Sequence, residues 1–182
     1  NCVLQNSYLE GSGAEFVGDW GVGAGGVGNR IINNMFVGWG HNCIMGAPNY
    51  GIIANNYFYN FWDDAIDPNG NNNVVIVGNV CDKVNAETVG AFVSLEHGCE
   101  RFIIANNLVR GMGGLVAVWD SKDVVIVGNR FFEPSISGAK LVLIGGSSDG
   151  VHVVGNLAEA QSLVSIEFDD RTVLAKKIVV ED

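Results

Sequence analysis

The chain has 182 residues, with 10 Lys and Arg against 20 Asp and Glu, so its formal net charge is −10. This balance disfavours nucleic acid and anionic membranes as partners, because both require cationic patches. Hydrophobic residues make up 48% of the chain, which is enough for a packed core and argues against disorder, and no apolar run reaches the roughly 18 residues of a membrane span.

Taken in chain order, the sequence repeats one short pattern. Each copy has an aliphatic residue, two variable positions and an Asn, and the third position is Gly or Asn in six of the seven copies. The marker asparagines are 28, 22, 23, 28, 22 and 27 residues apart, a periodicity typical of a solenoid. The copies are Val3–Asn6, Ile31–Asn34, Ile53–Asn56, Ile76–Asn79, Ile104–Asn107, Ile126–Asn129 and Val153–Asn156, and a weaker eighth copy is Ile178–Glu181.

The repeat length and the residue types indicate the architecture. The copies are short and β-branched, so each is predicted to be a strand. A spacing of 22 to 28 residues leaves no room for a helix between successive strands, whereas a coil of two or three short strands fits, with coils stacked in parallel about 4.8 Å apart. We therefore expect residues 1–182 to form a single all-β domain, a right-handed parallel β-helix of about seven coils. Because the chain begins inside a strand-like segment, we expect it to belong to a longer protein.

The Gly-Asn and Asn-Asn doublets explain the turn that ends each marker strand. A tight bend needs a left-handed residue, and Gly and Asn tolerate that conformation best. The stacked asparagines are expected to hydrogen-bond from coil to coil and to form a ladder from Asn6 to Asn156. Residues two positions after each marker are mostly aromatic or aliphatic, which predicts an interior column of Tyr8, Phe36, Phe58, Cys81, Val109, Phe131 and Ala158.

The four cysteines are Cys2, Cys43, Cys81 and Cys99, and none belongs to a C-x-x-C pair. A zinc site is therefore not expected. Since Cys81 lies in the predicted interior column, we expect free and mostly buried thiols.

A further strand is expected late in each coil. Apolar residues alternate in the segments 42–46, 65–69, 91–97, 115–120, 140–144 and 163–168. If Ile66, Val93 or Leu95, Val118 and Ile166 point inward, then Asp67, Glu96, Trp119 and Glu167 point outward on the same sheet. Asp63, Asp64, His97 and Asp120 then lie at its edge. A register slip of one residue would reverse these orientations.

The whole chain resembles the pectate-lyase-like superfamily of right-handed β-helices, which includes pectate lyases, polygalacturonases, mannuronan epimerases, and the tailspikes and depolymerases of phages. The resemblance rests on the repeated aliphatic-x-(Gly/Asn)-Asn turn followed by Phe. It also rests on the segment from Asp63 to Asp67, which is similar to the acidic start of a strand in these families. The resemblance implies that a glycan lies along one parallel sheet, where outward side chains of neighbouring coils are about 4.8 Å apart.

The resemblance also implies catalytic candidates. Polygalacturonases use an Asp pair with a Gly-His-Gly downstream, and the corresponding segment here is Glu96-His97-Gly98, with no Arg-x-Lys after it. The preceding coil has Asn42 and Met45 where those enzymes have a further Asp. The hydrolase set is thus incomplete, and the catalytic candidates are Asp63, Asp64, Asp67, Glu96 and His97.

Each catalytic candidate has a structural alternative. Paired carboxylates suit acid–base work on a glycosidic bond or the binding of Ca²⁺ together with backbone carbonyls. Asp63 and Asp64 could equally close a turn and solvate it. His97 is either a general acid or base or a turn histidine. Ca²⁺ is the only cofactor that these residues suggest.

The substrate-binding candidates are Trp119, Asp120, Arg101 and Trp62. Indole faces suit the apolar faces of sugar rings, although both tryptophans could instead cover the core. Arg101 and Arg110 could hold a uronate carboxylate, or each could neutralise a neighbouring acid.

Two functions therefore stay open, both with a polysaccharide as the expected partner. The first is processing of an extracellular or cell-wall glycan by a lyase, hydrolase or epimerase. The second is a non-catalytic β-helix, such as a segment of a tailspike, adhesin or structural rod, that binds glycan or protein. The chain is short for a complete enzyme of this group and has no evident helix to cap its first coil. An uncapped coil exposes a strand edge, so we expect a missing capping segment or a homo-oligomer, located outside the cell, at its surface or on a virion.

Overall fold

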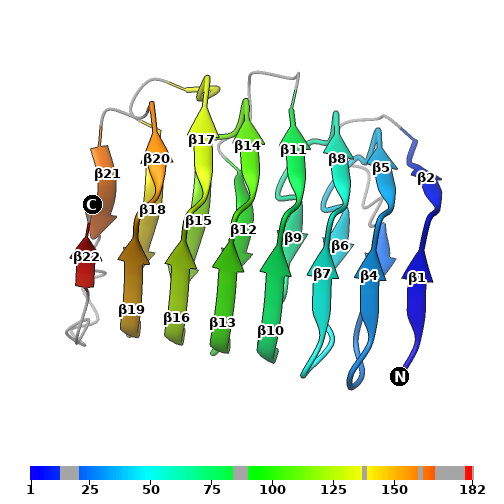
Figure 1. Cartoon of the computed structure of the whole chain (residues 1–182), viewed down its shortest axis with the longest axis horizontal. Coiled ribbons are helices and arrows are strands. Elements are labelled where there is room, and N and C mark those ends of the chain that lie inside the picture. Colours follow the sequence, from blue (N-terminus) through cyan, green and yellow to red (C-terminus); the bar gives the residue numbers. More distant parts are fainter. Residues whose placement is uncertain (13–20, 84–89, 137–138, 160–161, 167–178, 182) are drawn as a thin grey trace.

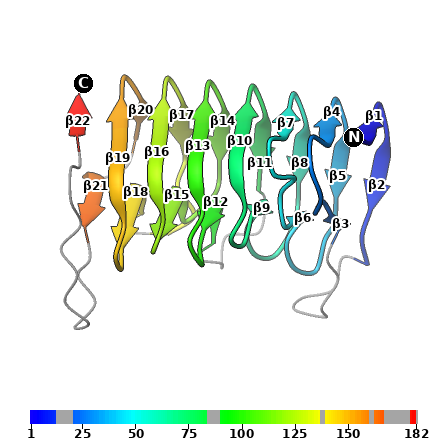
Figure 2. The same cartoon turned by 90° about the horizontal axis from the view of Figure 1, so that it is seen from below.

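The computed structural model describes residues 1–12, 21–83, 90–136, 139–159, 162–166 and 179–181. These residues form a parallel β-solenoid of three sheets and contain no helix. Successive coils lie side by side from the N-terminus to the C-terminus (Figure 1), and the view from below shows the sheets on different sides of the solenoid (Figure 2). The predicted all-β parallel solenoid is confirmed. Within the described ranges there is no helix able to span a membrane.

Three sheets run along the solenoid, and the chain visits them in turn. Sheet A contains β1 (Val3–Gln5), β4 (Arg30–Ile32), β7 (Ile52–Ala54), β10 (Asn72–Val77), β13 (Glu100–Ala105), β16 (Lys122–Val127), β19 (Asp149–Val154) and β22 (Val179–Glu181). Sheet B contains β2 (Tyr8–Glu10), β5 (Met35–Val37), β8 (Tyr57–Tyr59), β11 (Val80–Asp82), β14 (Leu108–Arg110), β17 (Arg130–Phe132) and β20 (Leu157–Ala158). Sheet C contains β3 (Val22–Gly23), β6 (Ile44–Met45), β9 (Ile66–Asp67), β12 (Ala91–Leu95), β15 (Gly114–Trp119), β18 (Lys140–Gly145) and β21 (Ser162–Ile166). The strands from β6 onward agree with the six predicted late strands to within two residues, and β3 was not predicted.

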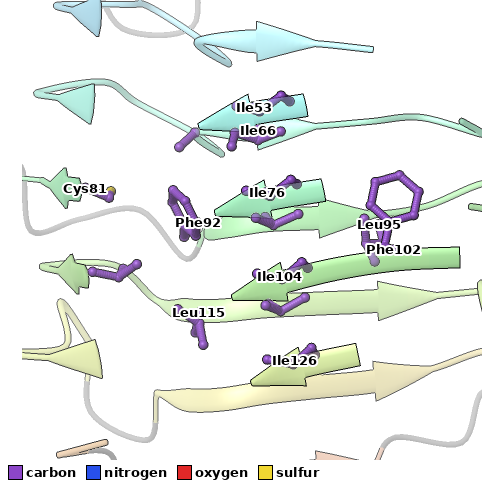
Figure 3. Close-up of a cluster of buried hydrophobic side chains, with 14 of the residues drawn as sticks. Ile53, Ile66, Ile76, Cys81, Phe92, Leu95, Phe102, Ile104, Leu115 and Ile126 are labelled. Carbon is purple, nitrogen blue, oxygen red and sulfur yellow. The ribbon is translucent and has the colours of Figure 1, made fainter. Parts of the chain in front are cut away.

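The core is a set of columns that run along the solenoid. The strands of sheet A from β4 to β19 each insert an aliphatic residue, and Figure 3 shows Ile53, Ile76, Ile104 and Ile126 stacked one coil above the next. Sheet B contributes the aromatic column, in which the rings of Phe36 and Phe58 stack with centroids 5.1 Å apart. These side chains are fully buried, so apolar contact holds neighbouring coils of this core together.

The asparagine ladder is present and lies inside the solenoid. Asn34, Asn56, Asn79, Asn107 and Asn129 are all buried. In each of them the backbone N–H and the side-chain amide both donate to the Oδ1 of the next asparagine. For Asn56 these distances are 2.9 and 3.0 Å, and its Nδ2 also donates to the carbonyl of Ile31 at 3.0 Å. The ladder thereby satisfies backbone groups that the turn would otherwise leave unpaired.

The predicted register is wrong in the first coil. Leu4 pairs with Ile31, so Asn6 falls opposite Asn33 and Ser7 takes the ladder position, where its N–H donates to Asn34 Oδ1 at 3.0 Å. Asn6 and Asn33 share a left-handed backbone, with φ of 53° and 56°. The interior column shifts with the register, because Leu9 pairs with Phe36 while Tyr8 is 61% exposed. The prediction fails here because Asn suits both the left-handed position of the doublet and the ladder position that follows it.

The last marker is also misplaced. Val180 pairs with Val153 and Glu181 pairs with Val154. Glu181 therefore lies two residues before the position of Asn156, and it is not the counterpart of the marker asparagine.

The cysteines behave as expected. All four are free thiols, with Cys43, Cys81 and Cys99 buried and Cys2 exposed. Cys81 is 1% exposed within the sheet B column, which confirms its interior position.

Candidate functional site

The strands of sheet C place a short outward column on one side of the solenoid. Ile66 pairs with both Ile44 and Val93, and all three are buried. The outward neighbours are then Met45, Asp67 and Ser94, followed by Ala117 and Leu143. The inward positions of Val93, Leu95 and Val118 are confirmed by their burial. Ser94 is the residue beside Asp67, whereas Glu96 lies just past the end of β12, and Glu167 lies outside the described residues.

Asp63, Asp64, Asp67 and Glu96, here called the acidic cluster, meet at this sheet. Asn42, in the preceding coil, joins two of them: its Oδ1 accepts from the backbone N–H of Asp64 at 3.1 Å, and its Nδ2 donates to Asp67 Oδ2 at 3.2 Å. Asp64 in turn accepts from the backbone N–H of Ala91 in the following coil at 2.7 Å. The cluster is therefore tied to the coils on both sides. The acidic cluster thus contains four of the five predicted catalytic residues.

Burial and mutual repulsion raise the pKa values of two members of the acidic cluster, Asp64 and Asp67. Burial raises the pKa of Asp64 well above its ordinary value, and the charge of Asp63 adds to the effect, while the N–H of Ala91 opposes it. Burial, and then the charges of Glu96 and Asp63, raise the pKa of Asp67 to about 6. Carboxyl groups that repel one another in a partly dry site do not all ionise together. Asp64 and Asp67 thus hold protons at a pH where ordinary carboxyl groups are ionised.

Two histidines flank the cluster. His41 Nδ1 lies 3.5 Å from Asp63 Oδ2, and His97 Nε2 lies 3.5 Å from Glu96 Oε2. The His97 side chain is 69% exposed and sits in a turn with φ of 57°, so it meets solvent at the edge of the sheet. Ser94 Oγ also donates to Glu96 Oε1 at 3.2 Å. Of these contacts, only the proximity of Glu96 and His97 was expected from the sequence.

A hollow of about 340 Å³ opens beside the cluster on the outer face of sheet C. Asp64 and Trp119 line it, together with Lys140 and the small residues Gly90, Ala91, Gly113, Gly114 and Ala117. The indole of Trp119 lies against Gly145, where an added Cβ would be only 2.1 Å from the ring. The hollow therefore combines an aromatic wall, an acid and an amine over a floor of small side chains.

Three predicted substrate-binding residues lie apart from this hollow. Asp120 accepts hydrogen bonds from the N–H and Oγ of Ser147 at 2.8 and 2.9 Å and thereby closes a turn. Arg101 belongs to sheet A, where it donates to Asn73 Oδ1 and Glu100 Oε2, both at 2.9 Å. Trp62 is half-buried in the segment before β9 and does not line the hollow.

A buried lysine lies behind the acidic turn, and sequence reasoning missed it. Lys83 is 4% exposed, and its Nζ donates to the carbonyls of Trp62 and Asp63 at 3.3 and 3.4 Å. It also lies 5.2 Å from the ring centroid of Phe61, within range of a cation–π contact. Burial lowers the pKa of Lys83. No motif marks this residue, because its role depends on which coil it packs against.

The described part of the chain contains no group of three or more His, Cys, Asp or Glu side chains arranged to hold a metal ion.

Comparison with known proteins adds little to this geometry. No family model matches the chain, and no curated protein matches it. Among solved structures, QnrB1, a plasmid-mediated fluoroquinolone resistance protein, aligns over 81% of this chain and 92% of its own, with 11% identity and a TM-score of 0.18. A similarity of that size supports no argument about fold or function.

Proposed function

We propose that this protein processes an extracellular polysaccharide on sheet C, with Asp67 as general acid and Glu96 as general base. The observation that carries the proposal is the meeting of Asp67 and Glu96 at the outer face of sheet C, where burial and then the neighbouring charge of Glu96 raise the pKa of Asp67 to about 6. Acid–base work on a glycan needs one protonated and one ionised group side by side. Environments that push two carboxyl groups apart in acidity supply that pair.

The hollow beside the cluster accommodates the sugar in this proposal. The indole of Trp119 provides a flat apolar wall on which a pyranose ring stacks. Gly113, Gly114 and Ala117 let the glycan approach the sheet closely, and the amine of Lys140 supplies a hydrogen-bond donor at the edge. Asp64 serves as a buried support that keeps the turn in place through Ala91.

The resemblance to the pectate-lyase-like superfamily supports the same reading. In that group the glycan lies along one parallel sheet of the solenoid, and here the acids and the hollow share sheet C. Whether the step is elimination, hydrolysis or epimerisation depends on the substrate, so the proposal extends to a polysaccharide-processing enzyme outside the cell.

A second candidate function is glycan binding without catalysis. It is favoured by the hydrogen bonds of Asp64, whose N–H donates to Asn42 and whose carboxyl group accepts from Ala91, as a purely structural turn residue would. The hollow lined by Trp119 and Lys140 would then bind a glycan that the protein does not change.

A panel of uronate-containing and neutral polysaccharides tests both functions. Processing is followed by ultraviolet absorbance for unsaturated products, by a reducing-end assay for hydrolysis and by NMR for epimerisation. We expect activity on at least one polymer, a loss of about 100-fold or more in Asp67→Asn and Glu96→Gln, and no change in Asp123→Asn. Asp123 is an exposed residue of β16 on sheet A, so it controls for the same chemical change elsewhere.

The outcomes separate the candidates. Binding to a polymer with no chemical change in it would leave the non-catalytic function. Equal activity in Asp67→Asn and the unsubstituted protein would refute the assignment of Asp67 as the acid.

A further inference from the structure

The outer face of sheet B carries a second polar and aromatic column, on a different side of the solenoid from the acidic cluster. Tyr59 pairs with Asp82, Asp82 with Arg110, and Arg110 with Phe132. All four alternate with buried residues of their strands, so their side chains point outward. Three steps between strands give the column a length of about 14 Å. Two aromatic residues thus bracket a charged pair along the rod.

The charged pair is rigid. Arg110 Nε donates to Asp82 Oδ1 at 3.0 Å, and Arg110 Nη2 donates to Asp82 Oδ2 at 2.6 Å. The hydroxyl of Tyr57 donates to the same Oδ2 at 3.3 Å. A two-point contact of this kind fixes the plane of the guanidinium. Yet the Arg110 side chain remains 49% exposed, so its other N–H groups face solvent from a fixed position.

The surface around this pair is hollowed. Two neighbouring hollows of about 410 Å³ each share Asp82, Arg110 and Glu133 as walls. Apolar groups border them: Phe132 and the 40% exposed Leu108 line one hollow. One coil away, the rings of Tyr57 and Tyr59 stack with centroids 6.2 Å apart and an angle of 15° between their planes.

We propose that this face of sheet B is a binding site for a neutral polysaccharide. A sugar ring presents an apolar face to aromatic or aliphatic groups and a rim of hydroxyls to fixed donors and acceptors. The column offers both, with an aromatic ring at each end and the fixed charged pair between them. The charges argue for an uncharged polymer. Arg110 is already paired with Asp82, and the walls of the two hollows also carry the acids Glu133 and Glu159. The amine of Lys83, which borders one hollow, is buried and donates to the carbonyls of Trp62 and Asp63, so an acidic chain would be repelled.

This site is independent of the proposed chemistry on sheet C. The four column residues belong to β8, β11, β14 and β17, and none of the residues that line the two hollows of sheet B also lines the hollow beside the acidic cluster. A non-catalytic site on another face would hold the protein on a polymer while sheet C acts, which raises the effective concentration of substrate.

Affinity gel electrophoresis tests the site directly. The background is Asp67→Asn, so that the polymer in the gel is not consumed. The probes are xylan, mixed-linkage β-glucan and galactomannan as neutral polymers and polygalacturonate as the acidic one. On this background we expect retardation by at least one neutral polymer, and a dissociation constant about tenfold higher with Tyr59→Ala or Arg110→Ala, as loss of one aromatic or fixed polar contact predicts.

Matched controls make the result specific. Tyr8→Ala removes another exposed tyrosine of sheet B in the first coil, and Arg30→Ala removes an exposed arginine of sheet A. Both should bind like the background variant, and thermal melts followed by circular dichroism establish that each protein is folded. If Tyr59→Ala or Arg110→Ala does not fold, Phe132→Ala replaces it.

Three results would overturn the proposal: no retardation by any of the neutral polymers, equal retardation of the Tyr59 and Arg110 variants and the background, or retardation by polygalacturonate alone. This measurement does not depend on whether sheet C is catalytic, because it detects binding of the polymer and not its conversion.

Discussion

Removing one central member of the asparagine ladder should measure how much the ladder stabilises the solenoid. Asn79 is fully buried. Its Oδ1 accepts from the backbone N–H and the Nδ2 of Asn56 at 2.9 and 3.0 Å. Its Nδ2 donates to the carbonyl of Ile53 at 3.1 Å and to Asn107 Oδ1 at 3.0 Å. Asn79→Ala deletes all four contacts while keeping the backbone of the turn.

The magnitude follows from those four hydrogen bonds. At a net value of about 1 kcal/mol each, their loss lowers the free energy of unfolding by about 4 kcal/mol. The buried N–H of Asn56 is the most costly group, since water does not reach it to replace the lost acceptor. The total free energy of unfolding of a domain is about 5–15 kcal/mol, so Asn79→Ala should remove a quarter or more of the stability.

Urea denaturation followed by circular dichroism provides the measurement, and Asn156→Ala provides the comparison. Asn156 accepts from the N–H and Nδ2 of Asn129 in the same geometry, at 2.9 Å each, but it is only partly buried at the end of the described ladder. Water can replace its bonds, so the loss should be less than half of that for Asn79. Native-state hydrogen exchange should place the opening in the coils next to Asn79. A loss under about 1 kcal/mol, or equal losses at both positions, would show that the ladder does not stabilise the fold in this way.

Three further outcomes follow from the structure. Because burial, Glu96 and Asp63 raise the pKa of Asp67 from 3.8 to about 6, the folded state binds more protons than the unfolded state between these values, and stability falls as pH rises through them. Asp67→Asn should remove the part of that fall that Asp67 causes, while the part caused by Asp64 remains, and should raise the free energy of unfolding at neutral pH by about 1–2 kcal/mol, after discounting for solvent screening; an unchanged melting temperature at neutral pH would contradict this. Alkylation of the native protein should label Cys2 alone among the four cysteines, whereas denaturant should expose all four to mass-spectrometric detection. Gly145→Ala places a Cβ 2.1 Å from the ring of Trp119, so it should reduce glycan binding at the sheet C hollow as much as Trp119→Ala does, and a native-like titration would show that the ring does not contact the ligand.

The repeat predicts the coil but does not fully predict its register. The spacing of marker asparagines and the β-branched strands lead directly to stacked parallel sheets, because only short strands and turns fit that spacing. The doublet is ambiguous, however, since Asn is suited to the left-handed position and to the ladder alike. In the first coil Asn6 occupies the former and Ser7 the latter. A pattern of residue types cannot separate two positions that favour the same residue.

The candidate site, like the register, could be predicted from the sequence only in part. Asp63, Asp64, Asp67 and Glu96 could be placed together from the sequence, because late strands of successive coils must align in one sheet. The lysine behind the turn could not, since Lys83 reaches Trp62 and Asp63 only through the relative lengths of the connections between strands. The repeat predicts contacts that recur in every coil, whereas the contacts of Lys83 depend on connection lengths that differ from coil to coil.

Two carboxyl groups of this solenoid have opposite surroundings, and the contrast supports a role for sheet C in chemistry. Asp82 on sheet B is neutralised by Arg110 one coil further along. Asp67 instead lies beside Ser94 of the next coil, and burial, together with the charges of Glu96 and Asp63, raises its pKa. Arrangements that lower stability persist where function needs a perturbed acid. If that is the reason here, Asp67→Asn must gain stability and lose activity in the same protein, whereas a merely structural carboxyl group would not produce both effects.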